Sequence, residues 1–148
     1  MTKLLFPLAL FLMAALGAKA QEQQYKVAAI GFYNLENLFD TEDDPDINDE
    51  EFLPDGTRQW TPEVYREKQR NMARVISELG TSLTPDGLAL LGVAEIENQR
   101  VLEDLVKEPA LADRNYQIVH YNSPDRRGID VGLLYHPKYF TVQSSRSI

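Results

Sequence analysis

The sequence predicts an α/β protein with a mixed sheet that carries helices on one face. The expected elements alternate as strand, helix, strand and helix before a run of strands, an order typical of layered α/β folds. Two of the expected strands are almost wholly apolar, as in strands whose two faces are both buried. We therefore expect one domain, in residues 21–148, with polar side chains gathered at the strand ends.

The first twenty residues have the features of a secretory signal peptide. Lys3 gives a basic start, residues 4–16 form an apolar run, and the Ala-Lys-Ala sequence at 18–20 is a small-residue cleavage site. A membrane anchor is the alternative, but the run is short for one. We therefore expect a secreted or periplasmic protein that has no membrane span after cleavage.

Charge and cysteine content limit what the protein binds and what stabilises it. The chain has no cysteine, so we expect neither disulfides nor a thiolate metal site. Its formal net charge is −8, and an acidic surface repels nucleic acid and phospholipid headgroups. A phosphate ester would therefore need a cation between itself and the protein, and a bound divalent ion would serve.

The first expected strand and the first expected helix rest on apolar pattern and capping residues. Residues 25–34 are nearly all apolar after Lys26, which predicts a strand, and residues 34–40 should form the loop that leaves it. Thr61 can cap a helix over 61–79, in which apolar residues recur at helical spacing. That helix should pack one stripe on the sheet, and its basic residues should form a largely solvated face, with contact to a phosphate backbone as the alternative.

Residues 40–56 predict a long acidic loop, because carboxylates dominate and prolines and a glycine interrupt any regular element. Asp44, Asp46 and Asn48 have the spacing of a calcium loop. The sixth position of such a loop needs glycine, and here it is Asp49. A solvated loop is the simpler interpretation, with looser cation binding as the alternative.

The second half of the chain predicts a strand, a helix and a run of strands. Residues 88–93 form an apolar strand that ends at Glu95, and residues 99–107 form a short helix. Two antiparallel strands, 116–121 and 129–135, should flank a basic turn. Residues 140–143 should begin another strand.

Asn34 and Glu95 each stand at the end of an apolar strand. A carboxylate in the position of Glu95 costs free energy unless it is paired, hydrogen-bonded or bound to metal. Mg²⁺ needs only one or two carboxylates because water and substrate oxygens complete its shell. A structural salt bridge is the alternative for Glu95, and a turn-closing role is the alternative for Asn34. Glu97 should brace the adjoining loop or helix.

A basic turn with two arginines lies between the last two expected strands. Arg126 and Arg127 suit phosphate, because a guanidinium group can donate to two oxygens at once, although a surface hairpin tip is the simpler interpretation. Asp130 should pair with one of them. His120 ends a strand beside the turn, and the sequence places no carboxylate to orient it as a general base.

Together these segments resemble the endonuclease/exonuclease/phosphatase superfamily, in particular its secreted bacterial, deoxyribonuclease-like members. FYNLENLFD (32–40) is similar to the family's first-strand motif, where Asn34 matches the active-site Asn. GVAEIEN (92–98) is similar to the metal-site motif, where Glu95 matches the Mg²⁺-binding Glu. SPDRRGIDVGLLY (123–135) is similar to a segment in which the basic turn lies near substrate.

The resemblance implies the N-terminal half of a four-layer α/β sandwich and metal-dependent hydrolysis of a phosphodiester. Glu95 would hold Mg²⁺, with Mn²⁺ or Ca²⁺ as alternatives, and Asn34 would act as the catalytic residue that orients the phosphate or the attacking water. Arg126, Arg127 and His120 would bind the substrate, which is nucleic acid or another phosphodiester.

In this family the general-base His and its partner Asp residues lie in the second half of the domain. We therefore expect an incomplete enzyme that is inactive alone, and an exposed apolar sheet face that lowers solubility. A phospholipid or a sugar phosphate as substrate is an alternative within the same superfamily. A non-catalytic secreted remnant that binds cations through the acidic loop is the alternative outside it.

Overall fold

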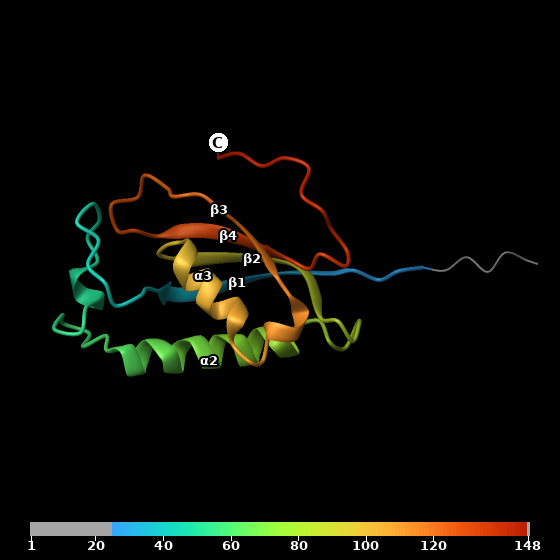
Figure 1. Ribbon diagram of the computed structural model, residues 1–148, viewed down its shortest axis with the longest axis horizontal. Coiled ribbons are helices and arrows are strands. Elements are labelled where there is room, and N and C mark those ends of the chain that lie inside the picture. The colour runs from blue at the N-terminus through green and yellow to red at the C-terminus, as the bar shows by residue number, and fades with distance from the viewer. Residues whose placement is uncertain (1–24, 148) are drawn as a thin grey trace, which may run out of the picture.

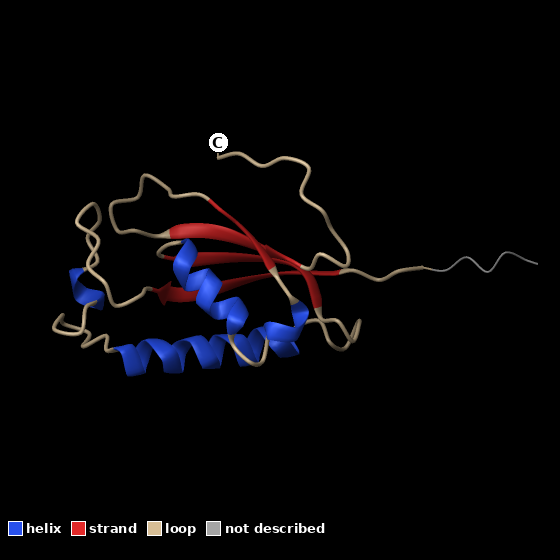
Figure 2. Cartoon of the chain, in the orientation of Figure 1, coloured by secondary structure: helices blue, strands red, loops and turns tan. Residues whose placement is uncertain are grey.

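The computed structural model describes residues 25–147 and contains a four-stranded sheet and two α-helices. Figures 1 and 2 show the helices on one side of the sheet. The predicted signal peptide, residues 1–20, lies outside the described residues. The elements are β1 (Ala29–Leu38), η1 (Glu50–Phe52), α2 (Pro62–Glu78), β2 (Leu88–Ile96), α3 (Gln99–Lys107), η2 (Ala112–Arg114), β3 (Gln117–His120) and β4 (Asp130–Tyr135).

The sheet is mixed, and its strand order is β1-β2-β4-β3. β1 and β2 are parallel, and the chain between them includes α2, while β4 is antiparallel to both β2 and β3. Asn34 lies opposite Ala94, which lies opposite Val131, so these three residues form one row across the sheet. The carboxyl ends of β1 and β2 therefore meet at one edge.

The core lies between the sheet and the helices. Leu91, Val93 and Leu134 on the sheet and Ile76 and Leu102 on the helices are fully buried. Burying a side chain of this size stabilises a fold by about 1.5–3 kcal/mol. Gly132 on β4 allows α3 to sit close, because a Cβ there would lie 2.8 Å from Leu102 Cδ1. The α/β class predicted from the element order is confirmed.

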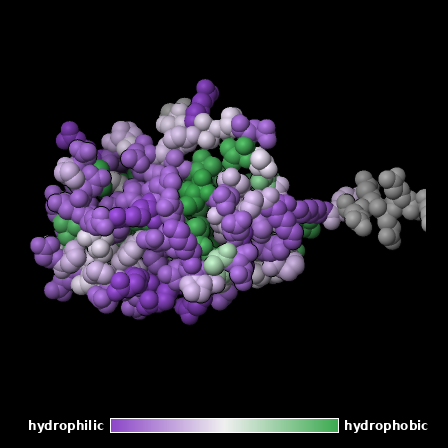
Figure 3. Space-filling model, in the orientation of Figure 1, coloured by the Kyte–Doolittle hydropathy of each residue, from purple (hydrophilic) through white to green (hydrophobic). Residues whose placement is uncertain are grey.

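The other face of the sheet is uncovered by the described residues. Ile30 and Phe32 are 69% exposed and Val131 is 67% exposed, although all three are large apolar side chains. By contrast, the side on which α3 lies in front of the sheet is mostly hydrophilic, with apolar side chains gathered in a band beside α3 (Figure 3). No helix in residues 25–147 is both long enough and apolar enough to cross a bilayer.

Three boundaries differ from the expected ones by more than one residue. β1 begins at Ala29 and runs on to Leu38, and β2 runs on to Ile96, because both strands continue through register shifts where we expected loops. The strand expected at 140–143 is wrong. The backbone N–H groups of Tyr139 and Phe140 both donate to His136 O, so the chain turns there.

Candidate active site

Asn34 and Glu95 meet where the regular pairing of β1 and β2 ends. Asn34 Nδ2 donates to Glu95 Oε1 across 2.8 Å. Asn34 Oδ1 in turn accepts from the backbone N–H of Glu36, 2.7 Å away, which fixes the orientation of the amide. One Nδ2 hydrogen and one Glu95 oxygen then remain for other partners. The structure therefore brings these two predicted residues together, while their chemical roles stay predictions.

The backbone at this edge is irregular in both strands. Glu95 has a φ of 57° and lies within a register shift between Ala94 and Ile96. Glu36 and Asn37 have φ values of 52° and 60°, inside the shift that follows Asn34. Residues other than glycine in this region cost about 1–3 kcal/mol each. A bulge redirects a side chain, and here it accompanies the contact of Glu95 with Asn34.

The basic turn is held by the acidic loop. The N–H of Asn48 donates to Arg126 O across 2.7 Å, and a Cβ on Gly128 would lie 2.2 Å from Ile47 Cδ1. The exposed Arg127 pairs with Asp125 at 2.6 Å. This pairing raises the pKa of Arg127, and the charge of Glu95 adds to the rise, so Arg127 lies within electrostatic reach of Glu95.

His120 and Asp130 form a buried pair beneath this turn. His120 Nε2 and Asp130 Oδ2 are 2.8 Å apart, and the two side chains are 3% and 4% exposed. Asp130 Oδ1 also accepts from the N–H of Ser123 at 2.8 Å. We call this arrangement the His120–Asp130 clasp. It ties the end of β3 to the start of β4 and thereby fixes the turn.

The clasp corrects two expectations. Asp130 was expected to pair with Arg126 or Arg127, and no carboxylate was expected to orient His120. Both were wrong, because the antiparallel pairing of β3 and β4 brings together side chains that are ten residues apart. The buried imidazole is engaged with Asp130, a placement that suits positioning of the turn better than direct contact with substrate.

Lys68 also reaches this edge, which the sequence did not predict. Its ammonium group donates to the backbone oxygens of Glu36 and Asn37, the second at 3.2 Å. Burial lowers its pKa, against the opposing effects of Glu36 and Glu95. We expected the basic residues of this helix to be largely solvated. The carbonyl groups that hold Lys68 come from the positive-φ segment of β1, and no sequence pattern signals that segment.

The chain matches the model of the endonuclease/exonuclease/phosphatase family over residues 29–148. It belongs to that family. The match spans both strand-end motifs and the basic turn, so the predicted family is confirmed. We found no match among curated proteins or among solved structures. Membership implies hydrolysis of phosphodiester or phosphoester bonds, and members of this family are typically dependent on divalent metals.

The side chains of this family member suit a metal ion held mainly by water and substrate. Residues 25–147 contain no group of three or more His, Cys, Asp or Glu side chains that could hold an ion. Glu95 Oε2 accepts no hydrogen bond from them, so it is available for a cation that needs a single carboxylate. In the acidic loop, by contrast, Asp44 Oδ1 already accepts a hydrogen bond from the N–H of Asp46 at 3.0 Å.

Asp40 and Glu97 hold together the segments that follow β1 and β2. Asp40 is buried and accepts from Asn98 Nδ2 at 2.9 Å and from Arg100 Nη2 at 2.7 Å. The N–H of Asp40 donates to Glu97 Oε2 at 2.7 Å. Burial raises the pKa of Glu97 to about 8. The bracing role predicted for Glu97 is confirmed, whereas Asp40 was expected only to begin the loop.

Proposed function

We propose that this protein takes part in metal-dependent hydrolysis of phosphodiester bonds, as a secreted, endonuclease-like protein. The observation that carries the proposal is the hydrogen bond between Asn34 and Glu95 where the regular pairing of two parallel strands ends, towards their carboxyl ends. It joins an amide donor to a carboxylate that has one free oxygen. Ligands of open α/β sheets bind at such strand ends.

Each residue at the edge has a distinct part in this proposal. Glu95 Oε2 would hold Mg²⁺, with Mn²⁺ or Ca²⁺ as alternatives, and Asn34 would keep the carboxylate in place. The ion, when bound, supplies charge stabilisation on the phosphoryl and leaving oxygens. The second Nδ2 hydrogen of Asn34 would donate to a phosphate oxygen.

The arginines of the basic turn would orient the substrate. Arg126 is exposed, and its guanidinium group makes no hydrogen bond or ion pair with residues 25–147, so it is free to donate to phosphate. Arg127 would contribute once it exchanges Asp125 for a phosphate oxygen. Both cations offset the acidic character of the chain at the place where a polyanion would approach.

The attacking water also needs a proton acceptor. His120 is buried and bonded to Asp130, so we do not place it in that role. We therefore propose that residues 25–147 supply metal and phosphate contacts and that hydrolysis also requires a base from outside them.

A Mg²⁺ titration by calorimetry tests the metal site without requiring turnover. The chain should bind Mg²⁺, Glu95→Ala should lose that binding, and Asp46→Asn in the acidic loop should keep it. If only the loop variant loses binding, the chain is a cation-binding protein of the acidic loop and the proposal is wrong.

Substrate assays test the chemistry separately. Plasmid DNA, a phospholipid and a sugar phosphate, each with Mg²⁺, distinguish the substrate classes of the family. In any form that turns over, Asn34→Ala or Glu95→Ala should remove most hydrolysis. Near-normal turnover in both variants would contradict the roles proposed for them.

A further inference from the structure

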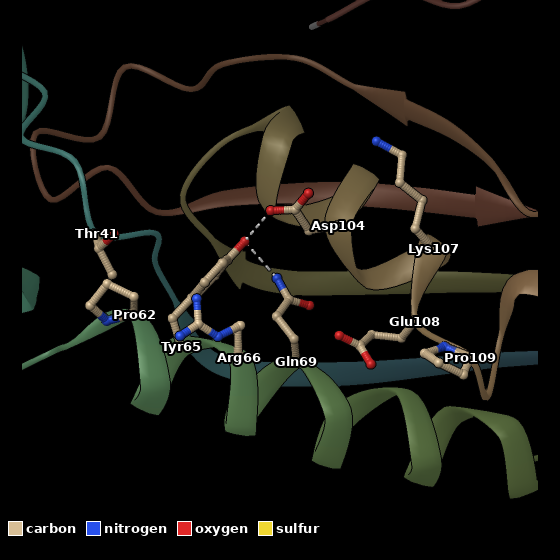
Figure 4. Close-up of a pocket in the computed structure, with 9 residues that line it drawn as sticks. All are labelled: Thr41, Pro62, Tyr65, Arg66, Gln69, Asp104, Lys107, Glu108 and Pro109. Atoms are coloured by element: carbon tan, nitrogen blue, oxygen red, sulfur yellow. Dashed lines mark hydrogen bonds between the residues drawn. The ribbon is translucent and has the colours of Figure 1, made fainter.

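A hollow of about 430 Å³ lies between α2 and α3 and contains no residue of the Asn34–Glu95 site (Figure 4). Residues of both helices and of the segments beside them line it: Thr41, Pro62, Tyr65, Arg66, Gln69, Asp104, Lys107, Glu108 and Pro109. The family resemblance assigns no role to this part of the chain. Its chemistry therefore has to be derived from the side chains themselves.

Gln69 contributes a buried acceptor that has no partner. The residue is 1% exposed, and its Nε2 donates to Tyr65 Oη at 2.8 Å and to Val101 O at 3.0 Å. Its Oε1 accepts nothing from the described residues. Turning the amide over would set two oxygens against each other at Val101, so the orientation is fixed. An unsatisfied buried acceptor costs about 1–3 kcal/mol, which a ligand with an N–H donor would recover.

The neighbouring hydroxyl cannot satisfy this acceptor. Tyr65 Oη donates its only hydrogen to Asp104 Oδ2, 2.8 Å away. Burial is the larger cause and this hydrogen bond the smaller cause of a raised pKa of Tyr65. The hydroxyl therefore stays protonated, and its hydrogen stays bonded to Asp104. A donor for Gln69 Oε1 must therefore enter from outside the protein.

Glu108 supplies a second acceptor and a negative charge. Figure 4 shows its carboxylate facing Gln69 Oε1 across the hollow, while Lys107 extends away from both. The Glu108 side chain is half-buried and makes no hydrogen bond or ion pair with residues 25–147. Arg66, the other basic residue of the lining, is paired with Glu63 at 2.8 Å. Glu108 also caps the end of α3, where the helix dipole favours positive charge.

We propose that this hollow binds the ammonium group of a small primary amine. Three N–H donors on one cation match a neutral amide oxygen, a carboxylate and the carboxyl end of a helix. The rings of Pro62, Tyr65 and Pro109 line the same space and can contact the methylene groups of such an amine. The site is independent of the proposed hydrolysis.

Titration with n-butylammonium chloride, followed through the side-chain amide NMR signal of Gln69, tests the proposal. Butylammonium should shift that signal in a saturable way. n-Butanol lacks the charge and tetramethylammonium lacks N–H donors, so both should bind at least about tenfold more weakly, since hydrogen bonds to charged groups contribute about 1.5–3 kcal/mol.

Two isosteric variants complete the experiment. Glu108→Gln should weaken butylammonium binding about tenfold by the same reasoning. Glu103→Gln should leave it unchanged, because Glu103 accepts from Gln99 on the same helix and does not line the hollow. Equal shifts with all three probes, or equal binding by the Glu108→Gln variant, would show that the hollow holds only water and would overturn the proposal.

Discussion

The helix-covered face of the sheet and the edge that holds Asn34 and Glu95 differ in how regular their backbone is. On the helix-covered face, Leu91 and Val93 are fully buried and alternate along β2 with partly exposed residues. At the edge that holds Asn34 and Glu95, the ladder shifts register and three residues other than glycine adopt positive φ. The comparison teaches that a regular, packed face holds in place the strained backbone that aims the candidate site.

Removing a core side chain should give the largest effect on stability. Leu102→Ala should lower the free energy of unfolding by about 2–5 kcal/mol, because a fully buried leucine leaves a cavity. Val131→Ala on the uncovered face should change it by less than about 0.5 kcal/mol. Urea denaturation measures both. Equal losses would mean that the face of Val131 is covered in solution.

The pH dependence of stability should report the buried carboxyl of Glu97. Its pKa is about 8 in the folded protein against 4.5 for an ordinary Glu. Between these values the folded state binds more protons than the unfolded state. The free energy of unfolding should therefore fall as pH rises from 4.5 to 8, by at most about 1.4 kcal/mol per pH unit.

Urea denaturation with EDTA at a series of pH values measures this slope. The Glu97→Gln variant keeps an acceptor for the N–H of Asp40 but cannot ionise, so its profile should be flatter. Two other groups act in opposite directions on the remaining slope, since burial raises the pKa of Asp49 and lowers the pKa of His136. An unchanged slope in the variant would assign the pH dependence to other groups.

Relieving the strain at Glu95 should separate stability from function. Glu95→Gly should raise the free energy of unfolding by about 1 kcal/mol, because glycine adopts a φ of 57° without the steric cost that other residues have. The same change should abolish Mg²⁺ binding. Glu95→Gln is the matched control, since it keeps the strain and loses the charge. A loss of stability in the glycine variant would show that the hydrogen bond to Asn34 outweighs the strain.

Loosening the His120–Asp130 clasp should give the most local effect. His120→Ala removes the buried partner of Asp130 and should speed tryptic cleavage after Arg126 and Arg127 several-fold. Cleavage at the arginines of α2 should not change. His136→Ala is the control, because this histidine lies outside the clasp. Equal cleavage of the turn in both variants would mean that the acidic loop alone fixes it.

Local signals in the sequence were sufficient for much of the fold. Thr61 and Asn98 cap α2 and α3 as their residue types and positions indicate. The apolar runs located β1 and β2, and the family motifs located Asn34 and Glu95. Features that depend on pairing between distant residues were not predictable. The clasp requires the β3–β4 register, and the burial of Asp40 requires Asn98 and Arg100 to fold back onto it.

The two strands that run past their expected ends do so for one physical reason. Positive φ at Glu36 and Glu95 contradicts the local preference of glutamate, so a pattern-based interpretation ends each strand before them. Tertiary contacts override that preference. Residues 140–143 show the opposite error, since a stretch with an aromatic and two β-branched residues predicts a strand where the backbone has no regular structure.

The contacts of Ile47 and Asn48 with the basic turn have a mechanical consequence. Because Gly128 leaves no room beside Ile47 and the N–H of Asn48 is bonded to Arg126, neither segment can shift without the other. An insertion or a backbone cut within 41–49 would therefore displace both guanidinium groups while every strand stayed intact. Variation in the length of the acidic loop is thus a means of retuning the position of positive charge.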